Sequence, residues 1–447
     1  ALEIQKNTRP RNEVLSDALQ LFDEMEQTYW SSFPASFSQG VRGVWHRPSE
    51  NTTVAIQNVI ARYKANGINT IFLETYLHGD PIFQSQTFSQ YEIQQRLPFG
   101  LVDGQFDPLT TWLTEAHKQG LKVNVWFQTF YAGNINAGNK TRGGILESHP
   151  EWVNIQKSGM DGDPIPPSNL EPGAYFLDPA NPEVQTFLLT FIDEIVNRYP
   201  IDGFQLDYIR YPSALPVDRA GFVDSTWGYT PYARKEFAHQ YAELMAERLL
   251  GRDISNADEL IARLAKKDKD KFLKKDKTTI VEELAAFYDP VLINLKEDSR
   301  AWDAWNQYKT GKVDNLVYQA SRLIHETKPG LVISVAIFPD TVVALQRKHQ
   351  NWERWLKNNW VDAVAPMTLT SAQEVIERDT KKLHYAFKQP VYTGVFGPFN
   401  GDTPTDVAKQ VWSAVLGGGQ GVILFEGAHI TDQMLQALSS GLFKSTK

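Results

Sequence analysis

The sequence predicts an α/β protein, a (β/α)8 TIM barrel with an N-terminal helical extension and a long insertion after the fourth strand. From residue 41 onward, short apolar segments typical of strands alternate with amphipathic segments typical of helices. This alternation predicts a parallel sheet, and eight strand–helix units over roughly 400 residues favour a closed barrel. The sequence has no Gly-x-Gly-x-x-Gly motif after the first expected strand and no Walker loop. A nucleotide-binding open sheet is therefore the weaker interpretation.

Residues 1–40 are expected to form the helical extension, because the apolar side chains of Leu15, Leu19, Phe22 and Met25 recur at helical spacing. The barrel is expected over residues 41–447, with a helical insertion at about 213–312. Its eight strands are expected, in order, at Arg42–His46, Thr70–Tyr76, Lys122–Gln128, Gly203–Tyr208, Val332–Phe338, Asp362–Met367, Val391–Phe396 and Gly421–Glu426. Helices are expected between them at Thr53–Asn66, Pro108–Gln119, Pro182–Arg198, Val313–Thr327 and Thr405–Leu416.

The amino-acid composition restricts the kinds of molecule that the protein is expected to bind. The net charge of −8 argues against a nucleic acid or an anionic membrane surface as partner. Aromatic residues make up 12% of the chain, with 12 Trp, and aromatic rings stack on the apolar faces of sugars, which favours a carbohydrate ligand. The absence of cysteine excludes disulfides and thiolate metal sites, and there is no apolar run long enough for a membrane span. The chain starts at Ala1, which is compatible with removal of a targeting segment.

The fourth expected strand carries the first candidate for chemistry. In a strand, alternate side chains point to opposite faces, so Gly203, Gln205 and Asp207 share one face and Phe204 and Leu206 share the other. The bulky face suits packing against helices, whereas the small and polar face suits the barrel interior. Asp207 then stands at the C-terminal rim, where barrel enzymes place their active sites. The alternative is that Asp207 caps the next helix or holds a loop.

Three further acids lie at or just after the ends of expected strands, namely Glu74, Asp340 and Glu426. Hydrolysis of a glycosidic bond requires two carboxyl groups, one to protonate the leaving group and one to attack or to activate water. We expect Asp207 to be the nucleophile or base, and Glu426 is preferred over Glu74 and Asp340 as the proton donor. Each also has a structural alternative: a rim salt bridge for Glu74, a turn after Pro339 for Asp340, and a ligand hydrogen bond for Glu426.

A substrate-binding set is expected around these acids. Aromatic and histidine side chains near strand ends could stack on sugars or bind their hydroxyl groups, although core packing is the commoner role of each such residue. The predicted set comprises Trp45, His46, Tyr76, His78, Trp126, Gln128, Tyr131, Gln205, Arg210 and Tyr211. No cofactor and no metal site are predicted, because neither a His-Glu-x-x-His motif nor any other convergent ligand spacing is present.

Several motifs resemble those of the bacterial glycosyl-hydrolase-like family 10, a family of barrels regarded as glycosidases or lipoproteins. The resemblance covers roughly residues 41–430 and rests on Val41-Arg42-Gly43-Val44-Trp45, Asn69 to Glu74 with Gly79-Asp80, Val125-Trp126-Phe127, His149-Pro150-Glu151-Trp152, Tyr175 to Pro179 with Asn181 to Val184, Asp202 to Pro212, and Asp362 to Met367. It implies hydrolysis of an oligo- or polysaccharide outside the cytoplasm, with cell-wall glycan as the favoured substrate class. It also implies that Asp207 is the main catalytic candidate and that Asp80, Trp126 and Phe127 lie on the binding side.

The same strand resembles the Asp-Gly-Phe-x-x-Asp strand of α-amylase-type barrels, in which that final Asp is the nucleophile. It also resembles the chitinase Asp-Gly-x-Asp-x-Asp-x-Glu motif, but Gln205 and Ile209 stand where that motif has its middle Asp and its Glu. The chitinase mechanism therefore lacks its proton donor in this chain. Two alternatives stay open: a non-catalytic glycan-binding barrel, and a metal-dependent deacetylase or peptidase, for which the sequence shows no ligand spacing.

Overall fold

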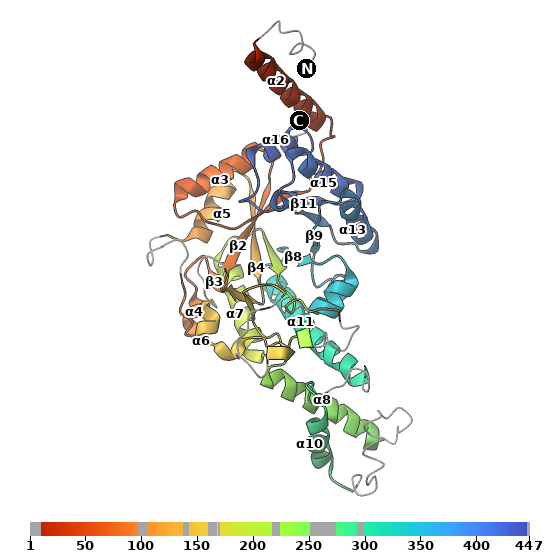
Figure 1. The fold of residues 1–447 in the computed structure, drawn as a ribbon. Helices are drawn as coiled ribbons and strands as arrows, with labels where there is room; N and C mark the ends of the chain where they lie inside the picture. The colour runs from red at the N-terminus through yellow and green to blue at the C-terminus, as the bar shows by residue number, and fades with distance from the viewer. Residues whose placement is uncertain are drawn as a thin grey trace.

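The computed structural model describes residues 10–96, 106–136, 143–159, 168, 170–216, 224–250, 274–292 and 299–444. Eight parallel strands close into a barrel in the order β1, β2, β4, β7, β8, β9, β10 and β11, with β11 pairing back to β1 (Figure 1). Their bounds are Val41–His46, Thr70–Leu77, Lys122–Gln128, Gly203–Asp207, Val332–Ile337, Ala363–Thr368, Tyr392–Val395 and Gly421–Phe425. The predicted fold class is confirmed.

Helices surround the strands. They are α3 (Thr53–Ala65), α5 (Pro108–Lys118), α7 (Pro182–Arg198), α11 (Ser299–Thr327), α12 (Trp352–Lys357), α13 (Gln373–Ala386), α15 (Pro404–Leu416) and α16 (Asp432–Ser440). Local sequence sets several of their starts: Thr52 and Asp107 cap α3 and α5 with their side-chain oxygens, and Thr403 forms a capping box with Asp406 at α15. Shorter elements lie in the loops, namely β3 (Asp80–Pro81), β5 (Tyr131–Asn134), β6 (Ala174–Phe176), α4 (Gln86–Gln90), α6 (Gly144–Ser148) and α14 (Gly397–Asn400).

Some expected bounds need correction. The strand expected to end at Tyr208 ends at Asp207, because Tyr208 adopts a positive φ of 46° that a strand does not allow. The strand expected to reach Glu426 ends at Phe425. The helix expected over Val313–Thr327 is the C-terminal part of α11, which begins at Ser299.

Side chains from alternate strand positions fill the barrel interior. Trp45, Phe72, Trp126, Phe396 and Ile423 form this inner cluster, while neighbouring positions such as Phe204 and Leu206 join the larger core between strands and helices. Small residues on other strands make room for the rings. A Cβ at Gly394 would lie 2.8 Å from Trp45 Cη2, so this position admits the indole only as glycine.

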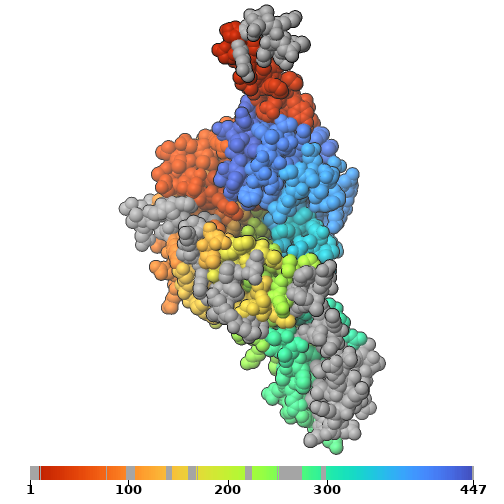
Figure 2. Space-filling view, viewed as in Figure 1, coloured from red at the N-terminus to blue at the C-terminus, as the bar shows by residue number. Residues whose placement is uncertain are grey.

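Two helical parts extend from opposite ends of the barrel (Figures 1 and 2). At one end, α2 (Arg11–Ser31) projects outward, and its Leu15, Leu19, Phe22 and Met25 are exposed; buried Trp30 anchors it by donating a 2.9 Å hydrogen bond to Thr405 Oγ1. At the other end, α8 (Pro231–Leu250), α10 (Lys277–Phe287) and the start of α11 share a separate, aromatic core. Among the described helices, none is both long and apolar enough to cross a membrane.

Candidate active site at the barrel mouth

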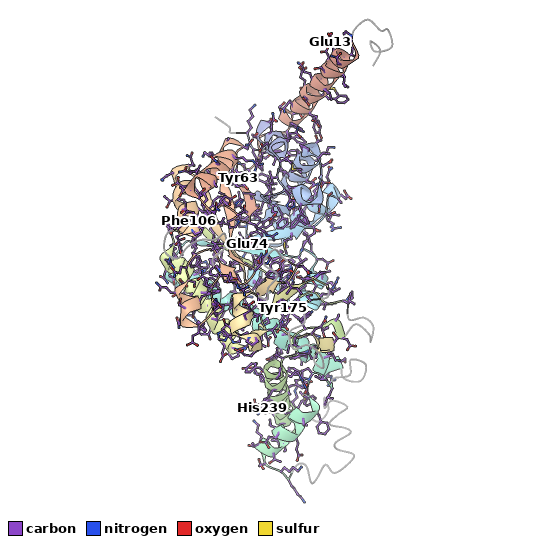
Figure 3. All side chains as sticks on the ribbon, turned by 60° about the vertical axis from the view of Figure 1, so that its left-hand side comes forward. Glu13, Tyr63, Glu74, Phe106, Tyr175 and His239 are labelled. Carbon is purple, nitrogen blue, oxygen red and sulfur yellow. The ribbon has the colours of Figure 1, made fainter. Side chains whose placement is uncertain are left out.

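Charged groups from four strands meet at the mouth of the barrel, two of them on the strands and two directly after them. Glu74 comes from β2, Asp207 ends β7, Glu426 follows β11, and Arg47 follows β1. Because β1 lies between β11 and β2, the closure of the barrel places Arg47 between Glu426 and Glu74. Figure 3 shows Glu74 within the barrel, between its surrounding helices.

Arg47 joins two of the predicted acids. Its Nε atom lies 3.4 Å from Glu74 Oε2 and 3.4 Å from Glu426 Oε2. The two carboxylate oxygens therefore lie next to the same nitrogen atom. The guanidinium group also lies 5.4 Å from the ring centroids of both Trp126 and Phe425, a cation–π arrangement. The sequence analysis missed Arg47. Continuing the alternation of β1 by two residues from Trp45 would have placed it on the inner face.

Glu74 is fully buried and accepts a hydrogen bond from Gln128 Nε2 on its Oε1 atom. Burial raises the pKa of Glu74 to about 8, since a carboxylate loses its hydration there. Arg47 opposes this increase in the pKa, while the negative charges of Glu426 and Asp207 add to it. The Glu74 carboxyl is therefore protonated at neutral pH, as a proton donor has to be.

Asp207 lies on the inner face, as predicted, and is 5% exposed. Its Oδ2 atom accepts a 2.8 Å hydrogen bond from Trp126 Nε1, and its Oδ1 atom accepts a 2.6 Å bond from the amide of Tyr208. Burial raises the pKa of Asp207, and these two donors counteract that increase because they stabilise the carboxylate. The guanidinium of Arg210 binds the carboxylate of Glu171 through both terminal nitrogens, at 2.9 and 3.0 Å, and its charge also counteracts the increase in the pKa of Asp207.

The two other acids occupy different surroundings. Glu426 contacts Arg47 on one carboxylate oxygen and His429 Nδ1 on the other, at 3.3 Å. Asp340 is exposed, and its Oδ1 accepts hydrogen bonds from the amides of Val342 and Val343 at 2.9 and 3.0 Å. Asp340 thus takes the turn position that the sequence left open as its alternative.

Several polar atoms at the mouth are buried without a hydrogen-bond partner among the described residues. They are Arg47 Nε, Glu74 Oε2, Gln128 Oε1 and Glu426 Oε2. Buried polar atoms in folded proteins are nearly always hydrogen-bonded, and exceptions concentrate where a ligand binds. Arg47 Nε contacts both carboxylate oxygens at 3.4 Å, so Gln128 Oε1 is the one of these four atoms with neither a hydrogen bond nor an ion pair among the described residues, and a ligand hydroxyl group could donate to it.

The predicted binding residues divide into two groups. Trp45, Trp126, Gln128 and Gln205 point into the barrel, where Trp45 Nε1 donates a 2.6 Å hydrogen bond to Gln205 Oε1 below the carboxyl groups. Tyr131 lies beside them: its ring is 4.7 Å from that of Tyr208 and 5.5 Å from that of His78.

The remaining members of the predicted set lie away from the mouth. Tyr76 would share the face of Glu74 by simple alternation, but a register shift between these two residues turns it into the outer core, where it stacks on Phe127. His46 also faces outward and contacts Tyr63 Oη and Glu50. Two more residues lie away from the mouth: Tyr211, which packs on His349, and Asp80, which accepts a hydrogen bond from the amide of Arg96. Arg210 is the exception, because it pairs with Glu171 but also lies 4.7 Å from the ring centroid of Tyr208, next to Asp207.

The described residues contain no group of three or more His, Cys, Asp and Glu side chains that could hold a metal ion.

Comparison with known proteins agrees with the family resemblance. Residues 40–248 match the family model described as glycosyl hydrolase-like 10. The chain is similar to the glycosyl hydrolase DigH of Escherichia coli K12, with 28% identity over 204 residues, which cover 39% of this chain and 43% of that protein. It is also similar to the glycosyl hydrolase YngK of Bacillus subtilis, with 24% identity over 25% of this chain and 19% of that protein. The match thus spans less than half the length of these curated relatives.

Solved structures share the fold over nearly the whole chain. The glycoside hydrolase domain of PgaB (BpsB) from Bordetella bronchiseptica has a TM-score of 0.54 at 13% identity, covering 90% of this chain and 99% of that one. The catalytic domain of the β-amylase of Paenibacillus polymyxa has a TM-score of 0.53 at 12% identity, covering 91% and 98%. At this level of identity the likeness concerns the fold, and both folds are TIM barrels that carry glycosidase sites.

Proposed function

With the glycosyl hydrolase-like 10 match over residues 40–248 as the premise, we propose that this protein hydrolyses glycosidic bonds in an oligo- or polysaccharide. The observation that carries the proposal is the arrangement at the barrel mouth. A buried carboxyl group that holds its proton, Glu74, shares that site with Asp207, whose carboxylate two donors stabilise. Unequal surroundings of this kind give two carboxyl groups different pKa values, so that one can act as the acid and the other as the base.

The proposed roles differ in one respect from those that the sequence favoured. Glu74, rather than Glu426, donates its proton to the glycosidic oxygen, which leaves with the electron pair of the broken bond. Asp207 either attacks the anomeric carbon or takes a proton from the attacking water. Arg47 binds Glu74 and Glu426 together and so holds the donor in place.

Cell-wall glycan is the proposed substrate class, and the proposed location is outside the cytoplasm. The support for both is the resemblance of the motifs to a bacterial glycosyl-hydrolase-like family. The aromatic residues at the mouth, Trp126 and Phe425 under Arg47 and Tyr131 beside Tyr208, suit a sugar ligand in general.

A non-catalytic glycan-binding barrel is the second candidate. The observation that favours it is that each carboxylate oxygen of Asp207 already accepts a hydrogen bond from the protein. In that case the carboxyl groups would only accept hydrogen bonds from sugar hydroxyls, and loss of one of them would weaken binding without any loss of product.

The test is release of reducing ends from peptide-free peptidoglycan strands and from a panel of other polysaccharides. Glu74→Gln and Asp207→Asn should each lower kcat by roughly 10²- to 10⁴-fold, the usual contribution of a positioned acid or base. Asp340→Asn is the matched control, because that carboxylate caps a turn and its amide analogue can still accept those hydrogen bonds. If wild type forms product and both site variants form it at the same rate, the proposed roles are refuted. If wild type binds glycan but forms no product, the second candidate is favoured.

A further inference from the structure

A groove runs along α11, outside the barrel mouth. Its central hollow has a volume of about 570 Å³ and is lined by α11 together with the segment after β8. A second hollow of about 240 Å³ shares Leu345, Gln346 and Asn351 with it, and a third of about 490 Å³ shares Asp303 and Gln307. Because these hollows share lining residues, they form one continuous depression, which we call the α11 groove. Figure 1 shows α11 running from the barrel toward the helical insertion.

We propose that the α11 groove binds a glycan strand, as a site separate from the barrel mouth. The inference rests on the proposed function, since it names a second contact for the same class of substrate. The α11 residues that line the groove begin at Arg300 and end at Asp314, and at a rise of 1.5 Å per residue this part of the helix extends over roughly 21 Å. That length accommodates several sugar units.

The chemistry of the lining suits a neutral, hydroxyl-rich or acetamido ligand. Gln307 and Gln346 are exposed carboxamides, and their side chains make no hydrogen bond within the described part of the chain. In the central hollow the one cationic side chain among the described residues, Arg354, is paired with Asp314 at 3.0 Å, whereas Arg248 and Arg300 line the third hollow together with Asp303. Carboxamides can both donate to and accept from sugar hydroxyl and acetamido groups, so the central hollow is the part of the groove that suits a neutral ligand.

Gly311 marks a point where nothing covers the floor of the groove. It lies inside α11, where glycine costs about 1 kcal/mol relative to alanine. A Cβ at Gly311 would have no heavy atom of the described residues within 4 Å apart from its own helix backbone and chain neighbours. The groove is therefore open above this position, and a larger side chain here would project into it.

The wall of the groove is joined by side-chain contacts to the rim of the barrel. Its rim residues Leu345 and Gln346 belong to the segment after β8, which continues to Lys348. The ammonium group of Lys348 is 4.1 Å from the ring centroid of Phe338, and Arg210 lies over both Phe338 and Tyr208, at 5.3 and 4.7 Å. Tyr208 directly follows Asp207. Packed side chains thus connect the wall of the groove to the rim of the barrel at β7 and β8.

The chain contains no cysteine, so a single introduced thiol can report on the groove alone. We suggest a Val342→Cys protein, because Val342 is exposed at the edge of the groove and is not among the residues proposed to bind the ligand. The thiol is labelled with an environment-sensitive fluorophore, and the protein is titrated with chitohexaose and with peptide-free peptidoglycan strands. The same titrations are made with Gly311→Leu, which fills the groove, and with Gly311→Ala as the matched control, which changes the helix without filling it. The label responds to ligand whether or not the protein is a hydrolase.

We expect a saturable signal with at least one of these glycans. Gly311→Leu should weaken it at least tenfold, while Gly311→Ala should stay within twofold of the unsubstituted protein. Glu74→Gln should leave the titration unchanged, which separates the groove from the mouth. An absence of any saturable signal, or equal affinity in the Gly311→Leu and Gly311→Ala proteins, would overturn the groove proposal and leave the proposed hydrolysis untouched.

Discussion

The Nε atom of Arg47 lies 3.4 Å from the Oε2 atom of Glu74, at the point where the first two barrel strands end side by side. This contact places a permanent positive charge beside the one carboxyl group at the mouth whose pKa burial raises to about 8. The same guanidinium group reaches Glu426 and covers the rings of Trp126 and Phe425. Arg47 therefore contacts two of the candidate acids and two of the aromatic rings at the mouth at the same time.

The protonation of Glu74 predicts the alkaline limit of activity. Wild-type kcat should fall as the pH rises through about 8, where Glu74 loses the proton that it has to donate. The measurement is a pH profile of kcat from pH 5 to pH 10 with a soluble glycan. A rate that stays constant to pH 10 would show that another group is the donor.

The same ionisation predicts a dependence of stability on pH. The pKa of Glu74 is about 8 in the folded protein and 4.5 as the ordinary value, so the folded state resists its ionisation. Relative to Glu74→Gln, wild type should therefore lose stability as the pH rises from 4.5 to about 8, with no further change above that range. Urea unfolding of both proteins at a series of pH values tests this. Parallel curves across the range would contradict the burial argument.

Removing the charge of Arg47 should move the alkaline limit of activity to higher pH. Arg47 lowers the pKa of Glu74, so Arg47→Ala should raise that pKa and shift the alkaline limb of the kcat profile above its wild-type position. Arg47→Lys keeps a positive charge and is the matched control, with a smaller shift. An alkaline limb in Arg47→Ala that falls below that of wild type would contradict the assignment of Glu74.

Loss of the hydrogen bond that Trp126 donates to Asp207 should move the acid limit of activity. Trp126 Nε1 donates to Asp207 and lowers the pKa of that carboxyl, so Trp126→Phe should raise the pKa and shift the acid limb of the kcat profile to higher pH. Phenylalanine retains much of the ring that packs in the barrel interior. Trp45→Phe, which removes the 2.6 Å bond to Gln205 instead, serves as the control and should leave the acid limb in place.

Two glycine substitutions should have opposite effects on stability. At Gly394 a Cβ would press on Trp45 Cη2 at 2.8 Å, so Gly394→Ala should destabilise the protein by about 1–3 kcal/mol through overpacking. At Gly311 the added methyl group meets nothing within 4 Å, and Gly311→Ala should stabilise α11 by about 1 kcal/mol. Thermal unfolding of the two variants beside wild type measures both. Equal shifts in Tm would contradict the packing difference between the two positions.

A buried lysine should also make the stability of the protein depend on pH. Lys309 lies among the rings of Trp302, Trp305 and Tyr211, and burial lowers its pKa to about 7. Since the folded state resists the charged form, Lys309→Met should be more stable than wild type below pH 7, and this advantage should shrink as the pH rises toward 10.5. Unfolding free energies of both proteins at pH 6 and pH 10 test the sign. An advantage that grows with pH would refute it.

The local pattern of residues determined much of this protein. Short apolar segments located all eight barrel strands, and alternation along the fourth assigned Gln205 and Asp207 to the inner face, because a strand that separates an interior from a helical layer needs two different faces. The same reasoning would have placed Arg47 inside, two residues after Trp45. Such information is local, and a sequence displays it directly.

Only the tertiary structure decided which groups meet and how they are charged. The register shift after Glu74 turned Tyr76 away from the mouth, and the closure of the barrel through β1 brought Arg47 between Glu74 and Glu426. The raised pKa of Glu74 and the groove beside Gly311 likewise depend on segments far apart in the chain. Burial and through-space charge depend on three-dimensional distance, and the spacing of residues along the chain does not fix that distance.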